Sequence, residues 1–63
     1  MLSKRQTHVI DILDDSGGWM TGKEIANMLN VTDRTIRSDI DTINKVYSEK
    51  LITSNLRSGY AII

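Results

Sequence analysis

Five side chains between positions 32 and 38 have the chemistry needed to bind a nucleic acid. They are Thr32, Arg34, Thr35, Arg37 and Ser38. An arginine guanidinium can form paired hydrogen bonds with a guanine edge, or it can clamp a phosphate. Threonine and serine hydroxyls can bond to phosphate oxygens or to base edges. This short segment is therefore the first candidate for a functional surface.

A single helix can present these side chains together. Thr32 is a favourable N-cap, and Val31 and Ile36 stand at the positions of a hydrophobic staple. Apolar residues then follow at steps of four, three and four, which predicts a buried stripe made of Ile36, Ile40, Ile43 and Tyr47. We expect the helix to run from about Asp33 to about Tyr47. Its opposite side would carry Arg34, Ser38, Asp41 and Lys45.

A second short helix is predicted just before this one. Thr21 and Glu24 have the spacing of a capping box, so the helix begins there. Its inward residues are expected to be Ile25, Ala26, Met28 and Leu29. Asn30 tolerates the left-handed conformation that ends a helix. Two short helices joined by about three residues form a helix-turn-helix, whose second helix enters the major groove of DNA.

The remaining elements complete one domain over residues 1–63. A first helix is expected from Leu2 to Asp15, capped by Ser3 with Gln6 and stopped by the glycines at 17 and 18. Trp19 and Met20 form a short strand-like step. The tail predicts two strands, 51–55 and 60–63, around a turn at 56–59. The fold class is therefore mainly α with a small β-hairpin: a winged helix-turn-helix of three helices plus a wing, about 51–63.

Four more residues are candidates for DNA contact. Arg57 and Ser58 occupy the predicted wing turn and could reach the backbone or the minor groove. Lys23, at the start of the second helix, and Lys45, late in the third, could touch phosphate. Thr32 together with the free N–H groups of the following turn forms a natural phosphate seat.

Composition limits the other functions that the chain could have. Eight basic and eight acidic residues give zero net charge, so a DNA-binding face requires the acids to gather elsewhere. The chain has no cysteine, and His8 is its single histidine, expected at the surface or the edge of the core. The glycines match neither a P-loop nor a dinucleotide fingerprint. We expect no enzyme activity, no cofactor, no metal, no membrane segment and a cytoplasmic location.

Arg34 and Arg37 could also have no binding role. Arginines on the outside of an amphipathic helix are often only solvated charges, and Arg37 with Asp41 is an ordinary pair at i,i+4.

Two other binding functions remain open. A winged helix can also serve only for protein–protein interaction, which Asp41 and the zero net charge would favour. An RNA-binding antiterminator would need exposed aromatic side chains for stacking. The chain offers Trp19, Tyr47 and Tyr60, with Tyr47 placed on the buried stripe.

The segment from Val31 to Ile40 resembles the recognition-helix motif of bacterial winged-helix regulators. Leu51–Ser54 followed by Arg57–Ile62 resembles their wing, and Glu24–Ala26 extends the likeness over nearly the whole chain. The resemblance is strongest to the N-terminal domain of regulators controlled by the sugar phosphotransferase system, of the mannitol- and lichenan-operon activator type. It is looser to the biotin operon repressor and to DeoR-type sugar repressors.

This resemblance implies a carbohydrate-operon regulator of which residues 1–63 are the N-terminal DNA-binding fragment. It implies a double-stranded DNA partner and a homodimer formed by regions outside this chain. The family's DNA contacts lie on the recognition helix, which here means Thr32, Arg34, Thr35, Arg37 and Ser38. The family often has Gly-x-Gly-Tyr in the wing, whereas this chain has Arg57 at the first glycine. The departure adds a cation and changes the expected turn.

Overall fold

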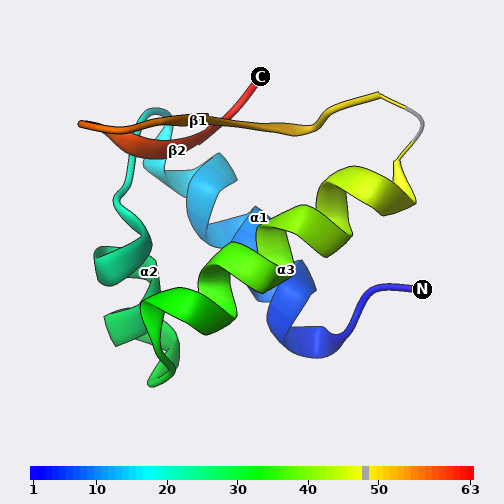
Figure 1. Ribbon diagram of the computed structural model, residues 1–63, viewed down its shortest axis with the longest axis horizontal. Coiled ribbons are helices and arrows are strands. Elements are labelled where there is room, and N and C mark those ends of the chain that lie inside the picture. The colour runs from blue at the N-terminus through cyan, green and yellow to red at the C-terminus, as the bar shows by residue number, and fades with distance from the viewer. Residues whose placement is uncertain (48) are drawn as a thin grey trace.

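Three helices and a two-stranded hairpin make up the fold in the computed structural model, which describes residues 1–47 and 49–63. The elements are α1 (Lys4–Ser16), α2 (Gly22–Leu29), α3 (Asp33–Val46), β1 (Ile52–Asn55) and β2 (Gly59–Ile62). In Figure 1 the hairpin lies along the top, with the three helices below it. This is the predicted winged helix-turn-helix.

The two predicted capping boxes are confirmed. Ser3 Oγ accepts from the Gln6 N–H at 3.1 Å, and the Gln6 side chain accepts from the Ser3 N–H at 3.0 Å. Thr21 and Glu24 form the same pair of bonds at the start of α2. Gly17 ends α1 with φ +66°, as its left-handed freedom predicts. The first helix begins at Lys4 rather than Leu2, because Ser3 is the cap and lies outside the helix.

The turn between α2 and α3 also has its predicted chemistry. Asn30 adopts φ 56°, ψ 46°, the left-handed conformation that ends α2. The Val31 N–H donates to the Ala26 carbonyl at 3.0 Å, which closes the turn. Thr32 Oγ1 then accepts from the Thr35 N–H at 3.2 Å and starts α3. The direction of α3 is thus set within three residues of the end of α2.

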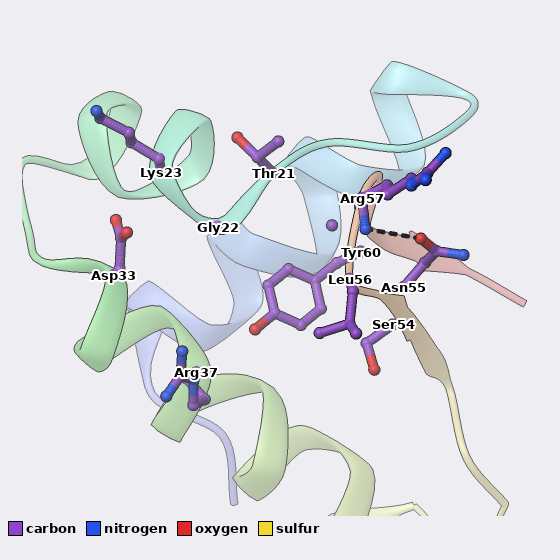
Figure 2. Close-up of a pocket in the computed structure, with 11 residues that line it drawn as sticks. Thr21, Gly22, Lys23, Asp33, Arg37, Ser54, Asn55, Leu56, Arg57 and Tyr60 are labelled. Carbon is purple, nitrogen blue, oxygen red and sulfur yellow. Dashed lines mark hydrogen bonds between the residues drawn. The ribbon is translucent and has the colours of Figure 1, made fainter.

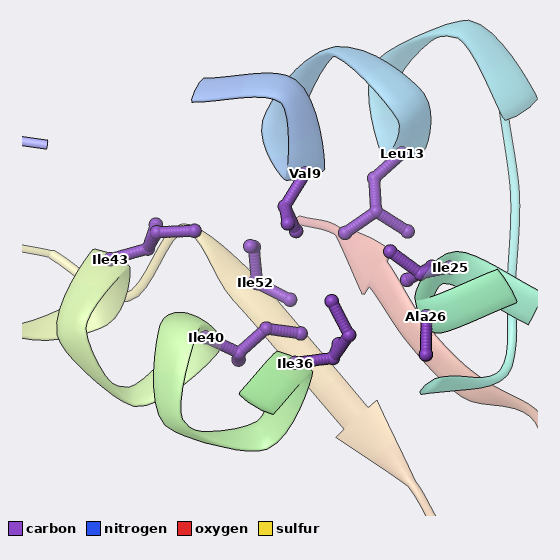
Figure 3. Close-up of a cluster of buried hydrophobic side chains, with 8 residues drawn as sticks. All are labelled: Val9, Leu13, Ile25, Ala26, Ile36, Ile40, Ile43 and Ile52. Carbon is purple, nitrogen blue, oxygen red and sulfur yellow. The ribbon is translucent and has the colours of Figure 1, made fainter. Parts of the chain in front are cut away.

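The core lies between the helices and β1 (Figure 3), and its buried members are Val9, Leu13, Ile25, Ala26, Ile36, Ile40, Ile43 and Ile52. Two predicted core residues are wrong. Tyr47 is 44% exposed, because it is the C-cap of α3 and its extended backbone leaves the helical stripe. Met28 is 62% exposed. At about 100° per residue it lies far from the centre of the buried Ile25–Ala26 side of α2.

The hairpin pairs Ile52 with Ile62 and Asn55 with Gly59. β1 begins one residue later than the predicted 51–55 and ends at the same residue, and β2 is shifted by one residue towards the N-terminus from the predicted 60–63. The strand-like step before α2 is confirmed at Met20, which exchanges two backbone hydrogen bonds with Tyr60, at 2.9 and 2.7 Å. The wing is therefore tied both to its own turn and to the segment that leads into α2.

Two residues hold the hairpin at this place. Asn44 on α3 donates from Nδ2 to the Ile52 carbonyl at 3.0 Å, and its Oδ1 accepts from the N–H groups of Leu51 and Ile52. Gly59 has φ +98°, and a Cβ there would lie 2.2 Å from the Met20 carbonyl oxygen. Only glycine allows this approach.

Candidate nucleic-acid interface

The third helix separates an apolar side from a polar one. Ile36, Ile40 and Ile43 face the core, while Arg34, Arg37, Ser38, Asp41 and Lys45 are exposed. Thr35 is half-buried. The predicted binding side of α3 is thus accessible, and the core packing behind it keeps the helix from turning.

The first turn of α3 is partly occupied by its own bonds. The Thr32 hydroxyl caps the Thr35 N–H and lies 3.1 Å from the Thr35 hydroxyl. Asp33 places a carboxylate in the same turn. The exposed Thr32 therefore acts first as a helix cap, and a phosphate there would rely on the N–H groups of the first turn rather than on this hydroxyl.

A buried carboxylate lies behind the polar side of α3, and the sequence analysis did not find it. Asp39 is 2% exposed. Arg5 on α1 binds it through Nε at 2.6 Å and Nη2 at 3.0 Å, and Gln6 Nε2 donates to it at 3.2 Å. The hydrogen bonds from Arg5 hold the pKa of Asp39 below its ordinary value, although burial opposes this effect. Asp39 is therefore part of the support of α3 and not of its outer surface.

A groove of about 510 Å³ opens between the start of α2, the first turns of α3 and the wing (Figure 2). It brings together three cations from three elements: Lys23, Arg37 and Arg57. Asp33 is the one acid among the described residues that line it. Among the described residues the ion-pair geometry is met only by Arg5 with Asp39, so no acidic side chain there pairs with these three cations. The Arg37–Asp41 pair, which belongs to the competing interpretation of solvated surface charges, does not form.

A second groove of about 290 Å³ lies between α3 and β1 and is lined in part by Arg37, Asp41 and Lys50. The two grooves together carry four of the eight basic residues but only two of the eight acidic ones. The zero net charge of the chain thus hides a positive side, which is the arrangement that DNA binding requires. Acids such as Asp11, Asp14 and Asp15 are on α1, away from these linings.

The predicted site residues fall into two groups. Lys23, Arg37 and Arg57 meet in the larger groove. The others lie outside both linings, along the outside of α3 or in the wing turn: Thr32, Arg34, Thr35, Ser38, Lys45 and Ser58. The two groups meet on α3, where the exposed Arg37 of the first group is close in sequence to Arg34 and Ser38 of the second.

Sequence reasoning missed several residues that shape this surface. Asn55 Oδ1 accepts from the N–H groups of Arg57 and Ser58, at 2.8 and 3.3 Å, and so folds the wing turn. An asparagine at the head of a turn is a local signal that could have been used. Ser54, Tyr60 and Lys50 enter the grooves through the packing of the hairpin on α3, for which the sequence carries no local signal.

Other kinds of site find no support in the described part of the chain. Over residues 1–47 and 49–63 no three histidine, cysteine, aspartate or glutamate side chains gather as metal ligands would. No helix there has the length and apolar content that crossing a membrane requires. His8 is exposed on α1, at the surface as expected.

Among the comparisons with known proteins, one family model matches the chain. No curated protein and no solved structure shows a significant match to it. The family model described as an HTH domain matches residues 5–61, which runs from the first turn of α1 to the penultimate residue of β2. With nearly its whole length covered, the chain belongs to the HTH domain family, a family of DNA-binding helix-turn-helix domains.

Proposed function

We propose that this chain is the sequence-specific reading head of a transcription regulator, with α3 in the major groove of double-stranded DNA. The observation that carries the proposal is the exposed polar side of α3 beside a groove where Lys23, Arg37 and Arg57 meet. The wing then lies on the backbone or at the minor groove. A DNA partner also implies a cytoplasmic location in a bacterium.

The residues take two kinds of role in this proposal. Arg34 and Arg37 read base edges or clamp phosphate, and Thr35 and Ser38 bond to base edges or phosphates nearby. The sugar–phosphate backbone of the DNA is contacted by Lys23, Lys45, Arg57 and Ser58. Thr32 caps the first turn of α3, whose N–H groups bind a phosphate. The backbone contacts supply affinity that falls with salt, whereas the base contacts supply sequence preference.

The assembly follows from the family resemblance. We propose that the chain is the N-terminal domain of a larger carbohydrate-operon regulator of the phosphotransferase-controlled type. Regions outside this chain would pair two reading heads on half-sites about 34 Å, or a multiple of that, apart. One head supplies few phosphate contacts, so the isolated chain would bind weakly.

A protein-docking role is the second candidate. Asp41 lies on the exposed side of α3, and Met28 is an exposed apolar side chain on α2. A partner protein with basic and apolar groups would fit such a surface, whereas a phosphate would be repelled by Asp41. The two candidates differ in whether any duplex is bound at low salt.

Selection from a random-sequence DNA duplex library, with the 63-residue chain as bait, tests the proposed function. The proposal predicts enrichment of a common sequence, with the preference relaxed at the position that Arg34 reads in Arg34→Ala and unchanged in Lys4→Ala. Lys4 is a matched control because it is an exposed cation on α1 that lines neither groove. If no duplex is retained at any salt concentration, the proposal is wrong and protein docking takes its place.

A further inference from the structure

The two grooves beside α3 share three residues: Arg37, Ser54 and Tyr60. Ser54 and Tyr60 are directly paired across the hairpin. Residues paired across two strands point to the same face of the sheet, so their hydroxyl-bearing side chains lie on the face towards Arg37. The two grooves therefore adjoin at these three residues, and together they are called the channel between α3 and the wing.

Tyr60 is held in this channel from two directions. Its backbone is fixed by the two hydrogen bonds to Met20. Its ring packs over Gly22, where a Cβ would come within 3.2 Å of the ring atom Cε2. Figure 2 shows the ring extending from β2 across the channel, with its hydroxyl directed to the side where Arg37 lies. The ring is therefore placed before any partner arrives.

The Tyr60 hydroxyl is available to a ligand. Within the described residues no side-chain hydrogen bond uses it, and no unpartnered polar side-chain atom there is buried. The hydroxyl therefore faces solvent inside a channel whose lining has more cations than acids. A phenolic O–H is a hydrogen-bond donor that matches an anionic oxygen.

The geometry of the DNA duplex indicates which part of it would lie in the channel. One sugar–phosphate backbone separates the major groove from the neighbouring minor groove. With α3 in the first and the wing at the second, that backbone must cross the space between α3 and the wing. We propose that this channel seats the crossing backbone, and that Tyr60 and Ser54 donate their hydroxyls to one of its phosphates beside the Arg37 guanidinium. This inference rests on the proposed function and adds two phosphate-binding residues to it.

A scan with neutral phosphates tests the contact directly. The probe is the duplex selected above, prepared as a series in which one phosphate at a time is replaced by methylphosphonate. Affinity of the wild-type chain is expected to fall about tenfold at one backbone position, since a hydrogen bond to a charged group is worth about 1.5 kcal/mol or more. In Tyr60→Phe the intact duplex should bind about tenfold more weakly, and the penalty at that position should shrink. Ser54→Ala should reduce the same penalty.

Tyr47→Phe is the matched control, because Tyr47 lies beyond the end of α3 and lines neither of the two grooves. It should change neither the affinity nor the scan. Thermal unfolding of Tyr60→Phe should match the wild type, which separates a lost contact from a lost fold. Equal binding and an unchanged scan in Tyr60→Phe would overturn the contact while leaving the proposed function intact. If the wild-type chain retained no duplex at all, both would be overturned together.

Discussion

Arg5 holds Asp39 with two parallel hydrogen bonds, Nε to Oδ2 at 2.6 Å and Nη2 to Oδ1 at 3.0 Å. The pair joins the first turn of α1 to the middle of α3, across 34 positions of sequence. Asp39 is almost fully buried, while the Arg5 side chain is 44% exposed. The carboxylate on the inner side of α3 is thereby neutralised from α1, and the rotation of α3 about its axis is fixed.

Replacing Asp39 by asparagine should lower the free energy of unfolding by about 1–2 kcal/mol. A hydrogen bond to a charged group is worth about 1.5–3 kcal/mol, and solvent at the exposed Arg5 reduces this. Because the folded state lowers the pKa of Asp39, the wild-type contribution is complete above the unfolded pKa of about 3.9 and is lost as pH falls through the folded pKa. Denaturant unfolding at pH 7 and at successively lower pH values measures both effects.

Comparing the Asp39→Asn variant with the wild type across the pH series separates the effect of the Asp39 charge from that of its shape. The stability gap between the two proteins should begin to close as the pH falls below the unfolded pKa of about 3.9. It should close fully only below the lower folded pKa of Asp39, where the folded wild-type carboxylate is itself protonated. A gap of constant size at every pH would mean that Asp39 acts through shape and not through its charge.

Asn44→Ala should loosen the hairpin from α3. The variant removes one donor and one acceptor that serve Leu51 and Ile52, and unpaired buried backbone groups cost about 1–3 kcal/mol. Asn27→Ala, at an exposed position of α2, is the matched control and should cost little. Hydrogen exchange of the wing amides is the more specific measurement, since it should speed up in Asn44→Ala alone. Unchanged exchange would show that the hairpin is held by its apolar contacts.

Gly59→Ala should destabilise the chain by more than about 2 kcal/mol, because a left-handed backbone and a backbone clash act together. The new Cβ would lie 2.2 Å from the Met20 carbonyl oxygen and 2.5 Å from the Thr21 Cα. Gly18→Ala meets nothing within 4 Å and serves as the control. The midpoint of thermal unfolding checks the difference, and similar midpoints for the two variants would contradict the close approach of the wing to Met20.

Arg34→Ala should relax base preference and cost about 1–3 kcal/mol of binding free energy, if its guanidinium reads a guanine. Arg34 is exposed on α3 and lines neither groove, so its loss leaves the fold and the channel in place. The measurement is the enriched sequence in the library selection. A preserved preference in the variant would remove Arg34 from base reading.

Arg57→Ala should weaken all duplex sequences alike, because a contact with the backbone carries no base information. The slope of the logarithm of affinity against the logarithm of salt concentration should flatten by about 1. Titrations of one selected and one unrelated duplex at several salt concentrations give both quantities. A change in sequence preference would assign the wing a reading role instead.

The features that could be predicted from the sequence are those set by interactions between residues close together in the chain. The capping boxes of α1 and α2, the left-handed Asn30 and the N-cap Thr32 each depend on residues within four positions of one another. They set the helix boundaries and the turn, and with them the side of α3 that is exposed. Arg34, Arg37 and Ser38 could be selected as candidates for the same reason.

The features that were missed depend on contacts between distant parts of the chain. Helical spacing places Asp39 beside the apolar stripe of α3 and Asp41 on the opposite side, but only packing against α1 buries Asp39 and brings Arg5 to it. The ring of Tyr60 meets Gly22 because the hairpin pairs at Tyr60 with Met20, in the segment that leads into α2. Helical spacing extended the apolar stripe to Tyr47, where the helix has already ended.

DNA reading by α3 is best tested by amide-shift mapping by NMR, with duplex DNA titrated into the 63-residue chain at low salt. The expected shifts concentrate at residues 32–38, at Lys23 and at the wing turn of Arg57 and Ser58, and they fade as the salt concentration rises. Shifts confined to the outer side of α1, or none at any salt concentration, would contradict DNA reading by α3.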